Sequence, residues 1–149
     1  MNSFYPPLPT VLGEGATLPA YAHAGDAGLD LSVVGEVLLR PGEHCIVTTK
    51  VSVAIPAGFV GLVVPRSGWG SRGLVLRHAI DVIDSGYRGE IHLPLWNINK
   101  NDWIHIHPGE RVAQLIIVPV AQVQVVQVED LDDTERGTGG FGSSGYGRL

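Results

Sequence analysis

Residues 91–96 read Ile-His-Leu-Pro-Leu-Trp. The aliphatic residues Ile91, Leu93 and Leu95 therefore alternate with His92, Pro94 and Trp96. Successive side chains of a β-strand point to opposite faces, and a period of two therefore predicts a strand with one buried face. The same period recurs in three further segments, which are 51–55, 104–107 and the Gln–Val alternation of 122–128. The chain is thus expected to be built from strands.

Glycine and proline separate these runs. The chain holds 20 Gly, about twice the average usage, together with 10 Pro. Turn signals that pair Pro with Gly stand at 41–42, 56–58 and 108–109, and no stretch of the sequence carries a convincing helical stripe. Segment 111–120 is apolar on both faces, which predicts a strand buried on two sides, with another subunit as one possible cover. The pattern favours an all-β fold, a jelly-roll-type β-barrel.

Length and composition place the chain among single-domain globular proteins. It has 149 residues, of which 44% are hydrophobic and 17% charged, so a disordered polyelectrolyte is excluded. No apolar run approaches the roughly 20 residues of a membrane span, and the first residues carry no signal-peptide pattern. The expected location is the cytoplasm. The single cysteine, Cys45, has no partner for an internal disulfide and is predicted to be a small core residue.

The charge balance bears on the kind of ligand. The formal net charge is -5, from 15 acidic and 10 basic residues. This balance argues against a protein that coats the phosphates of long nucleic acids. A small anionic ligand would need a local group of arginines, backbone N–H groups or a divalent cation.

Both ends of the chain differ in composition from its middle. About residues 1–10 are Pro-rich and predicted to be irregular. About residues 130–149 carry almost no core-forming side chains, and Phe141 and Tyr146 stand among six glycines after Arg136. This tail is predicted to be a mobile arm that becomes ordered on binding, with an ordinary frayed terminus as the alternative.

The segment Pro65-Arg66-Ser67-Gly68 follows the apolar run 60–64 and predicts a turn at the end of a strand. Ser67 is a candidate N-cap, and the N–H groups after it, with the Arg66 charge, suit an anion. A plain β-turn is the alternative.

Segment 81–90 places two carboxylates, Asp81 and Asp84, at a predicted hairpin, with an aromatic residue and an arginine directly after them. An aspartate held rigidly beside a phosphate site can act as general base for a water molecule. The alternative is a solvated turn in which Asp is favoured for its local hydrogen bonds.

Two other places hold potential metal ligands. Asp26 and Asp30 are expected on one face of a strand, and their carboxylates suit a Mg²⁺ ion that keeps most of its waters. His105 and His107 also share a predicted strand face, but two ligands make no site and the sequence indicates no third.

Taken in order, five segments closely resemble the motifs of the trimeric dUTPase family: AGDAGLDL (24–31), PRSGWGSRG (65–73), VIDSGYRGEI (82–91), ERVAQLIIVPV (110–120) and RGTGGFGSSG (136–145). The resemblance implies a jelly-roll trimer with three sites at subunit boundaries. It also implies hydrolysis of dUTP to dUMP and pyrophosphate, which keeps uracil out of DNA and supplies dUMP for dTMP synthesis.

Carried residue by residue, the resemblance makes Asp84 the carboxylate that activates the water attacking the α-phosphorus. Asp30 would hold Mg²⁺ through water. The remaining implied contacts are with the substrate: the phosphate chain for Arg66, Ser67, Gly68 and Gln114, the uracil region for His78, Val82 and Ile83, and the deoxyribose for Tyr87. In the arm, Arg136 would reach the γ-phosphate and Phe141 would stack over the base as the arm closes, and Gly142 would also contact the substrate.

This sequence departs from the family pattern at three positions. Many members have Asn at the position of His78, and most have Gly at that of Asp81, so both departures fall where uracil should dock. Trp69 is bulkier than the usual aliphatic residue and is expected to pack.

Two other functions are alternatives for a chain with this pattern. A deaminase acting on dCTP would need a glutamate where Pro94 stands, and a non-catalytic nucleotide-binding regulator could keep the same fold.

Overall fold

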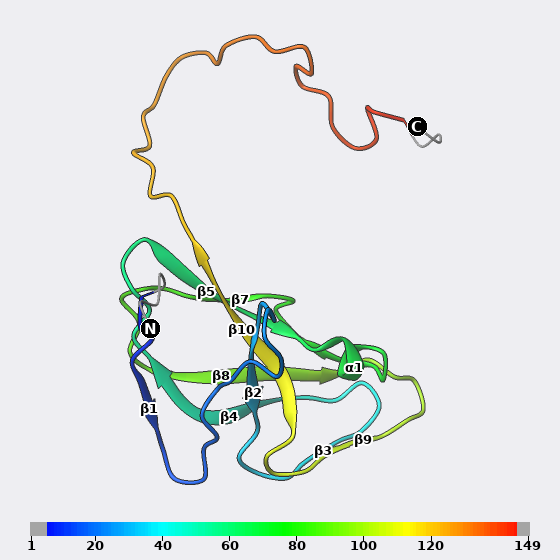
Figure 1. The fold of residues 1–149 in the computed structure, drawn as a ribbon. Coiled ribbons are helices and arrows are strands. Elements are labelled where there is room, and N and C mark those ends of the chain that lie inside the picture. Colours follow the sequence, from blue (N-terminus) through cyan, green and yellow to red (C-terminus); the bar gives the residue numbers. More distant parts are fainter. Residues whose placement is uncertain (1–5, 146–149) are drawn as a thin grey trace.

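The computed structural model describes residues 6–145 and has ten strands and one short helix, α1 (Ser67–Gly70). One four-stranded sheet has the order β1 (Thr10–Leu12), β4 (His44–Val53), β8 (Glu90–Asn97) and β6 (Leu74–Leu76). The second has the order β2 (Leu29–Ser32), β10 (Arg111–Pro119), β5 (Phe59–Pro65) and β7 (Asp81–Ile83). A two-stranded sheet joins β3 (Val37–Leu39) and β9 (Ile104–Ile106) (Figure 1). The predicted all-β class is confirmed, with jelly-roll-like antiparallel sheets in place of one closed barrel.

The core lies between the sheets and follows the period of two. In β8, the side chains of Ile91, Leu93 and Leu95 are at most 1% exposed, while His92 and Trp96 face solvent. The predicted alternation is therefore confirmed there, although Pro94, on the same face as His92 and Trp96, is buried as well. The apolar residues of β9 are buried in the same core.

A buried polar side chain connects the sheets. Asn97, at the end of β8, is fully buried, and its amide nitrogen donates to the carbonyls of Leu39 (3.1 Å) and Asp102 (2.8 Å). Its amide oxygen accepts from the N–H of Asn99 at 3.0 Å. Because a buried amide without partners is costly, these contacts fix β3 against β8.

The second sheet brings together segments that lie far apart in the sequence. Strand β10 is central, and its Gln114 pairs with Asp30 of β2 on one side and with Val64 of β5 on the other. Strand β7 then pairs with β5 through Asp81 to Ile83. Four of the motif segments are therefore neighbours in one sheet.

Two expectations about strands were wrong. The Gln–Val alternation of 122–128 forms no strand, because the segment leaves the body after β10 and meets no strand partner among residues 6–145 (Figure 1). Its valines are strongly exposed, with Val125 at 90%. Segment 81–90 is not a hairpin, because β7 pairs with β5 while β8 pairs with β4 and β6.

The strand predicted at 111–120 is confirmed, although its burial is incomplete. Strand β10 is buried at Val112, Ala113 and Leu115, and half-buried over most of its second half. Cys45 lies in β4 and packs against the core. Burial raises the pKa of its thiol, and the nearby Glu43 carboxylate raises it further, so the thiol stays protonated at neutral pH. Among the described residues, no helix is long and apolar enough to cross a membrane.

Candidate functional site

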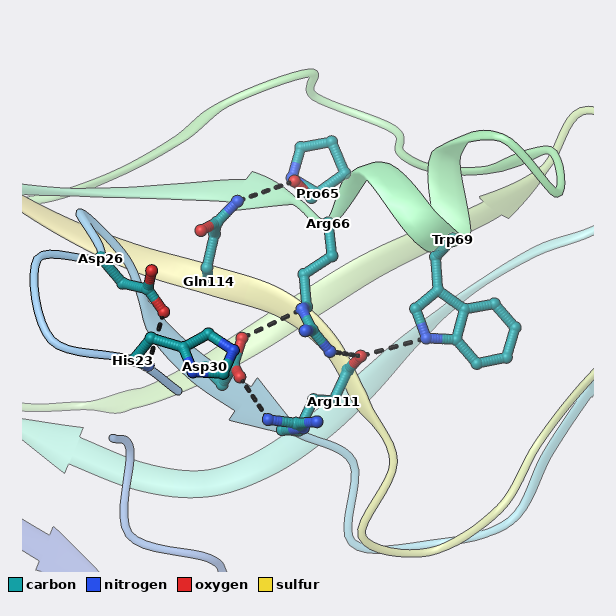
Figure 2. Close-up of polar contacts among 8 residues, drawn as sticks. All are labelled: His23, Asp26, Asp30, Pro65, Arg66, Trp69, Arg111 and Gln114. Carbon is teal, nitrogen blue, oxygen red and sulfur yellow. Dashed lines mark hydrogen bonds and ion pairs between the residues drawn. The ribbon is translucent and has the colours of Figure 1, made fainter. Parts of the chain in front are cut away.

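Asp30 is the centre of a group of charged side chains at the end of the second sheet. Its Oδ1 lies 3.0 Å from Nε of Arg66, and its Oδ2 accepts from Nη1 of Arg111 at 2.9 Å. The backbone carbonyl of Arg111 accepts from Arg66 (3.1 Å) and from the indole N–H of Trp69 (3.0 Å), as Figure 2 shows. The Asp30 side chain is only 11% exposed, whereas the side chains of Arg66 and Arg111 are 32% and 51% exposed, so water screens the contact with Arg111 more than the contact with Arg66.

Two adjoining clefts share Arg66 and Ser67. The first, of about 230 Å³, is lined by Ala22, Asp26, Ala27, Gly28, Asp30, Arg66, Ser67 and Gln114. The second, of about 330 Å³, is lined by Arg66, Ser67, Gly68, Trp69, Arg72 and Glu110. Hydroxyl, amide and guanidinium groups here are donors that suit a chain of phosphates. We call these two hollows together the arginine cleft.

The backbone at Gly28 approaches the side chain of Gln114 closely in this cleft. Gly28 faces Gln114 so closely that a Cβ at this position would lie 2.9 Å from the Cβ of Gln114. Any side chain there would push Gln114 away. Gln114 in turn donates from its amide nitrogen to the carbonyl of Pro65 at 3.4 Å.

Two details of this region differ from expectation. Ser67 is not the N-cap, because that position falls on Arg66 and no side chain caps the helix. Asp26 is not on a strand with Asp30 but in the turn before β2, where its carboxylate accepts from the N–H of His23 at 2.8 Å. Ser67 and Asp26 still line the arginine cleft. The expected packing of Trp69 is confirmed, because it is 8% exposed.

A separate cleft of about 240 Å³ contains Asp84. It is lined by Asp81, Val82, Ile83, Asp84, Tyr87, Glu90 and His92. Asp84 directly follows β7 and opens a turn in which its carbonyl accepts from the N–H of Tyr87 at 3.0 Å. The Tyr87 hydroxyl donates to the carbonyl of Glu90 at 3.0 Å, which fixes the ring against the cleft. We call this the Asp84 cleft.

The edge of β7 offers backbone groups to this cleft. Strand β7 is the last strand of its sheet, so one side of it has no strand neighbour among residues 6–145. The N–H of Val82 donates to Oδ1 of Asp81 at 3.1 Å. His78 is exposed in the turn before β7 and is not among the residues that line the cleft.

The two clefts lie at opposite ends of β5. Ile83, next to Asp84, pairs with Gly61, whereas Arg66 directly follows Pro65. Five residues of strand separate the two positions, which amounts to roughly 17 Å. One chain therefore does not bring Asp84 to the arginine cleft.

The C-terminal arm lies away from both clefts. After β10 the chain runs out from the body (Figure 1), and residues 120–145 form no strand. Arg136 donates from Nε to the carbonyl of Gly139 at 3.0 Å, and the Phe141 ring is exposed. Gly142 has a positive φ of 92°. Tyr146 lies outside the described residues.

Sequence reasoning missed some residues of the clefts. Arg111 holds Asp30, and Arg72 stacks over the Trp69 ring with its guanidinium carbon 4.4 Å from the ring centroid. Glu90 and His92 line the Asp84 cleft. Arg111 and Arg72 both stand inside the quoted motif segments, so a search for further charged residues within those motifs would have found them.

Comparison with known proteins identifies similar sequences and structures. The family model described as dUTPase matches residues 14–145. A deoxyuridine 5'-triphosphate nucleotidohydrolase of Cutibacterium acnes is 50% identical over 143 residues, covering 95% of this chain and 93% of its own. The dUTPase of Staphylococcus bacteriophage 80alpha with dUpNHpp has a TM-score of 0.87 at 33% identity, covering 97% of this chain and 99% of its own. A mutant dUTPase from phage phi11 of S. aureus, described with a structural Mg(II) ion, has a TM-score of 0.79 at 30% identity, covering 86% of this chain and 100% of its own.

Proposed function

Because this chain belongs to the dUTPase family of deoxyuridine 5'-triphosphate nucleotidohydrolases, we propose that Asp84 activates the water that attacks the α-phosphorus of dUTP. The new bond joins the water oxygen to the α-phosphorus, and the bond to the bridging oxygen of the pyrophosphate breaks. Asp84 accepts a proton from the water, so the products are dUMP and pyrophosphate. The observation that carries this proposal is that Asp84 lines a cleft together with an aromatic ring and a strand edge.

The arginine cleft supplies the phosphate contacts in this proposal. Phosphoryl transfer needs positioning and charge neutralisation more than covalent help. Arg66 lines both hollows of this cleft and is held by Asp30, so less of its side-chain entropy would be lost when phosphates bind. Ser67, Gly68 and Gln114 add polar groups along the same cleft.

Asp30 fits an outer contact to Mg²⁺ better than a direct one. Each of its oxygens already accepts one guanidinium N–H, but a carboxylate has about four acceptor positions. A water held by the ion can donate to a remaining position, whereas direct coordination would displace an arginine. Mg²⁺ bound in this way would neutralise charge on the phosphates.

The Asp84 cleft is proposed to bind the nucleoside. Backbone groups of Val82 and Ile83 on the free edge of β7 would pair with uracil, and the Tyr87 ring would pack on the deoxyribose. Asp81, which replaces the usual Gly, accepts the Val82 N–H in the absence of ligand. Uracil would therefore have to displace this contact if it uses that N–H group. His78, exposed before β7, would contact the base only if its turn moves toward the cleft.

We propose a homotrimer with its sites at subunit boundaries. The roughly 17 Å between Asp84 and Arg66 along β5 is too long for both to act on one phosphate group within a single chain. A second copy that places its arginine cleft against the Asp84 cleft of the first copy would let both residues act on the same substrate molecule. The exposed valines of 122–128 offer an apolar strip for contact with a further copy.

Product analysis tests the activity and its specificity. The full chain is incubated with Mg²⁺ and, separately, dUTP, dCTP, dTTP or UTP, and the products are separated by ion-exchange chromatography. We expect dUMP and pyrophosphate from dUTP alone. Deamination of dCTP would indicate the rival enzyme activity, and no consumption of any nucleotide would indicate a binding protein. Hydrolysis of dUTP would keep uracil out of DNA and supply dUMP for dTMP synthesis.

Tyr87 is expected to exclude ribonucleotides. The Tyr87→Ala variant should lower the ratio of kcat/KM for dUTP to that for UTP by about 10-fold or more, because the pocket gains room for a 2′-hydroxyl. Tyr87→Phe keeps the ring and loses only the hydroxyl contact to Glu90, so it should keep most of the discrimination. Equal ratios in the wild-type and Ala proteins would remove Tyr87 from sugar recognition.

A further inference from the structure

The outer face of the small β3–β9 sheet carries potential metal ligands that nucleotide hydrolysis does not use. Glu36, His105 and His107 each offer one ligand atom, and these atoms all lie within 4.8 Å of one another. His105 and His107 alone make no metal site. The third ligand comes from a residue 69 positions away in the sequence. We call these residues the Glu36 cluster.

Strand register explains why these side chains meet. Val37 pairs with Ile106, and Leu38 pairs with His105. Extending this antiparallel register by one residue beyond Val37 places Glu36 opposite His107. Val37 and Ile106 are buried in the core, and alternation therefore turns Glu36 and both histidines toward solvent. The sheet lies at the edge of the molecule, away from β7 (Figure 1).

The opposite end of the same sheet supports this pairing. The guanidinium carbon of Arg40 lies 5.7 Å from the centroid of the Trp103 ring. Arg40 follows Leu39, and Trp103 precedes Ile104. Because Leu39 pairs with Ile104, Arg40 and Trp103 lie opposite each other. The outer face thus has matched cross-strand contacts at both ends, and Glu36 is held on the histidine side by the register of β3.

The geometry of the Glu36 cluster is close to that of a coordinated ion. Nε2 of His105 and Oε1 of Glu36 are in direct hydrogen-bond contact at 2.7 Å, which a bound ion would replace, and the two imidazole centroids are 4.1 Å apart. Tetrahedral zinc with bonds of about 2.0–2.2 Å sets its ligand atoms roughly 3.3 Å apart. All three side chains are exposed, so small rotations about their side-chain bonds bring them to that spacing without moving the strands.

We propose that Glu36, His105 and His107 bind a divalent transition-metal ion, with Zn²⁺ as the ion that fits the ligand set. Two imidazoles and one carboxylate are ligands that zinc accepts, and a water molecule fills the fourth position. Mg²⁺ strongly prefers oxygen ligands, so the cluster selects against the ion expected at the nucleotide site. The net charge of -5 also favours a cation. The bound ion ties the end of β9 to the start of β3.

Calorimetric titration of the metal-free full chain with ZnCl₂ tests the proposal. We expect a zinc site in the wild type whose Kd rises at least about tenfold in His107→Gln and in Glu36→Gln, because each variant loses one ligand. His44→Gln removes an exposed histidine of β4 and is the matched control, with an unchanged Kd. Without metal, all variants should unfold at the wild-type temperature, since the substituted side chains are exposed.

Two further outcomes decide the proposal. Zinc should raise the unfolding temperature of the wild type, and this increase should be absent in His107→Gln. A millimolar excess of Mg²⁺ should leave zinc bound. The proposal is overturned if the wild type does not bind zinc, if both cluster variants bind it as tightly as the wild type, or if Mg²⁺ displaces it.

Discussion

The Asp84→Asn variant is expected to lose kcat for dUTP by about 10²–10⁴-fold while its affinity for the nucleotide changes little. The amide keeps the size of the carboxylate and its place after β7, but it does not accept a proton from water. The measurement is single-turnover hydrolysis of dUTP with saturating Mg²⁺, together with the Kd of a non-hydrolysable imido analogue. A loss confined to the chemical step assigns the general base.

Asp81→Asn is the matched control, because Asp81 is the other aspartate of the Asp84 cleft and lies three residues away. Its Oδ1 accepts the Val82 N–H, and an amide oxygen can accept the same bond. We expect this variant to keep kcat within about tenfold of the wild type, which is less than the loss of a general base. Normal turnover in Asp84→Asn, or a larger loss in Asp81→Asn, would move the catalytic role to another residue.

A chain that ends at Glu135 is expected to fold and assemble but to lose most of its activity. All ten strands and the exposed valines of 122–128 remain in this chain. It lacks Arg136, proposed to reach the γ-phosphate, and Phe141, proposed to stack over the base. Closure of the arm would expel water and complete the site, so kcat/KM for dUTP should fall by at least about 100-fold.

Sedimentation velocity and steady-state hydrolysis are measured on the same sample of the shortened chain. The Glu135→Gln variant of the full chain changes the residue next to the removed segment and should keep the wild-type rate. A shortened chain that is trimeric and fully active would make the arm an ordinary terminus. A shortened chain that is monomeric would assign the arm a role in assembly.

The contacts of Asp30 show which residues of this site the sequence resemblance identified and which it missed. Its carboxylate holds Arg66 and Arg111 at 3.0 and 2.9 Å, and neither contact follows from the spacing of these residues in the sequence. The sequence resemblance selected Asp30, Arg66 and Gln114, which the structure places around one cleft. It did not select Arg111 as a partner of Asp30, because that contact depends on how β10 pairs with β2.

Local periodicity is enough to predict the strands that have one buried face. Ile91, Leu93 and Leu95, and again Ile104 and Ile106, are buried as their period of two predicts, because alternation is a local property of extended backbone. The same local rule failed for 122–128. A strand also needs a neighbour for its backbone hydrogen bonds, and the described residues offer none there.

Which strands become neighbours depends on the folded chain as a whole. The sheet order set β7 beside β5 instead of β8, left Asp84 and Arg66 at opposite ends of β5, and brought Glu36 to His107. These pairings depend on the burial of faces from many segments at once. Periodicity shows which face of a strand is buried, but it does not identify the partner strand, which can lie far away in the sequence.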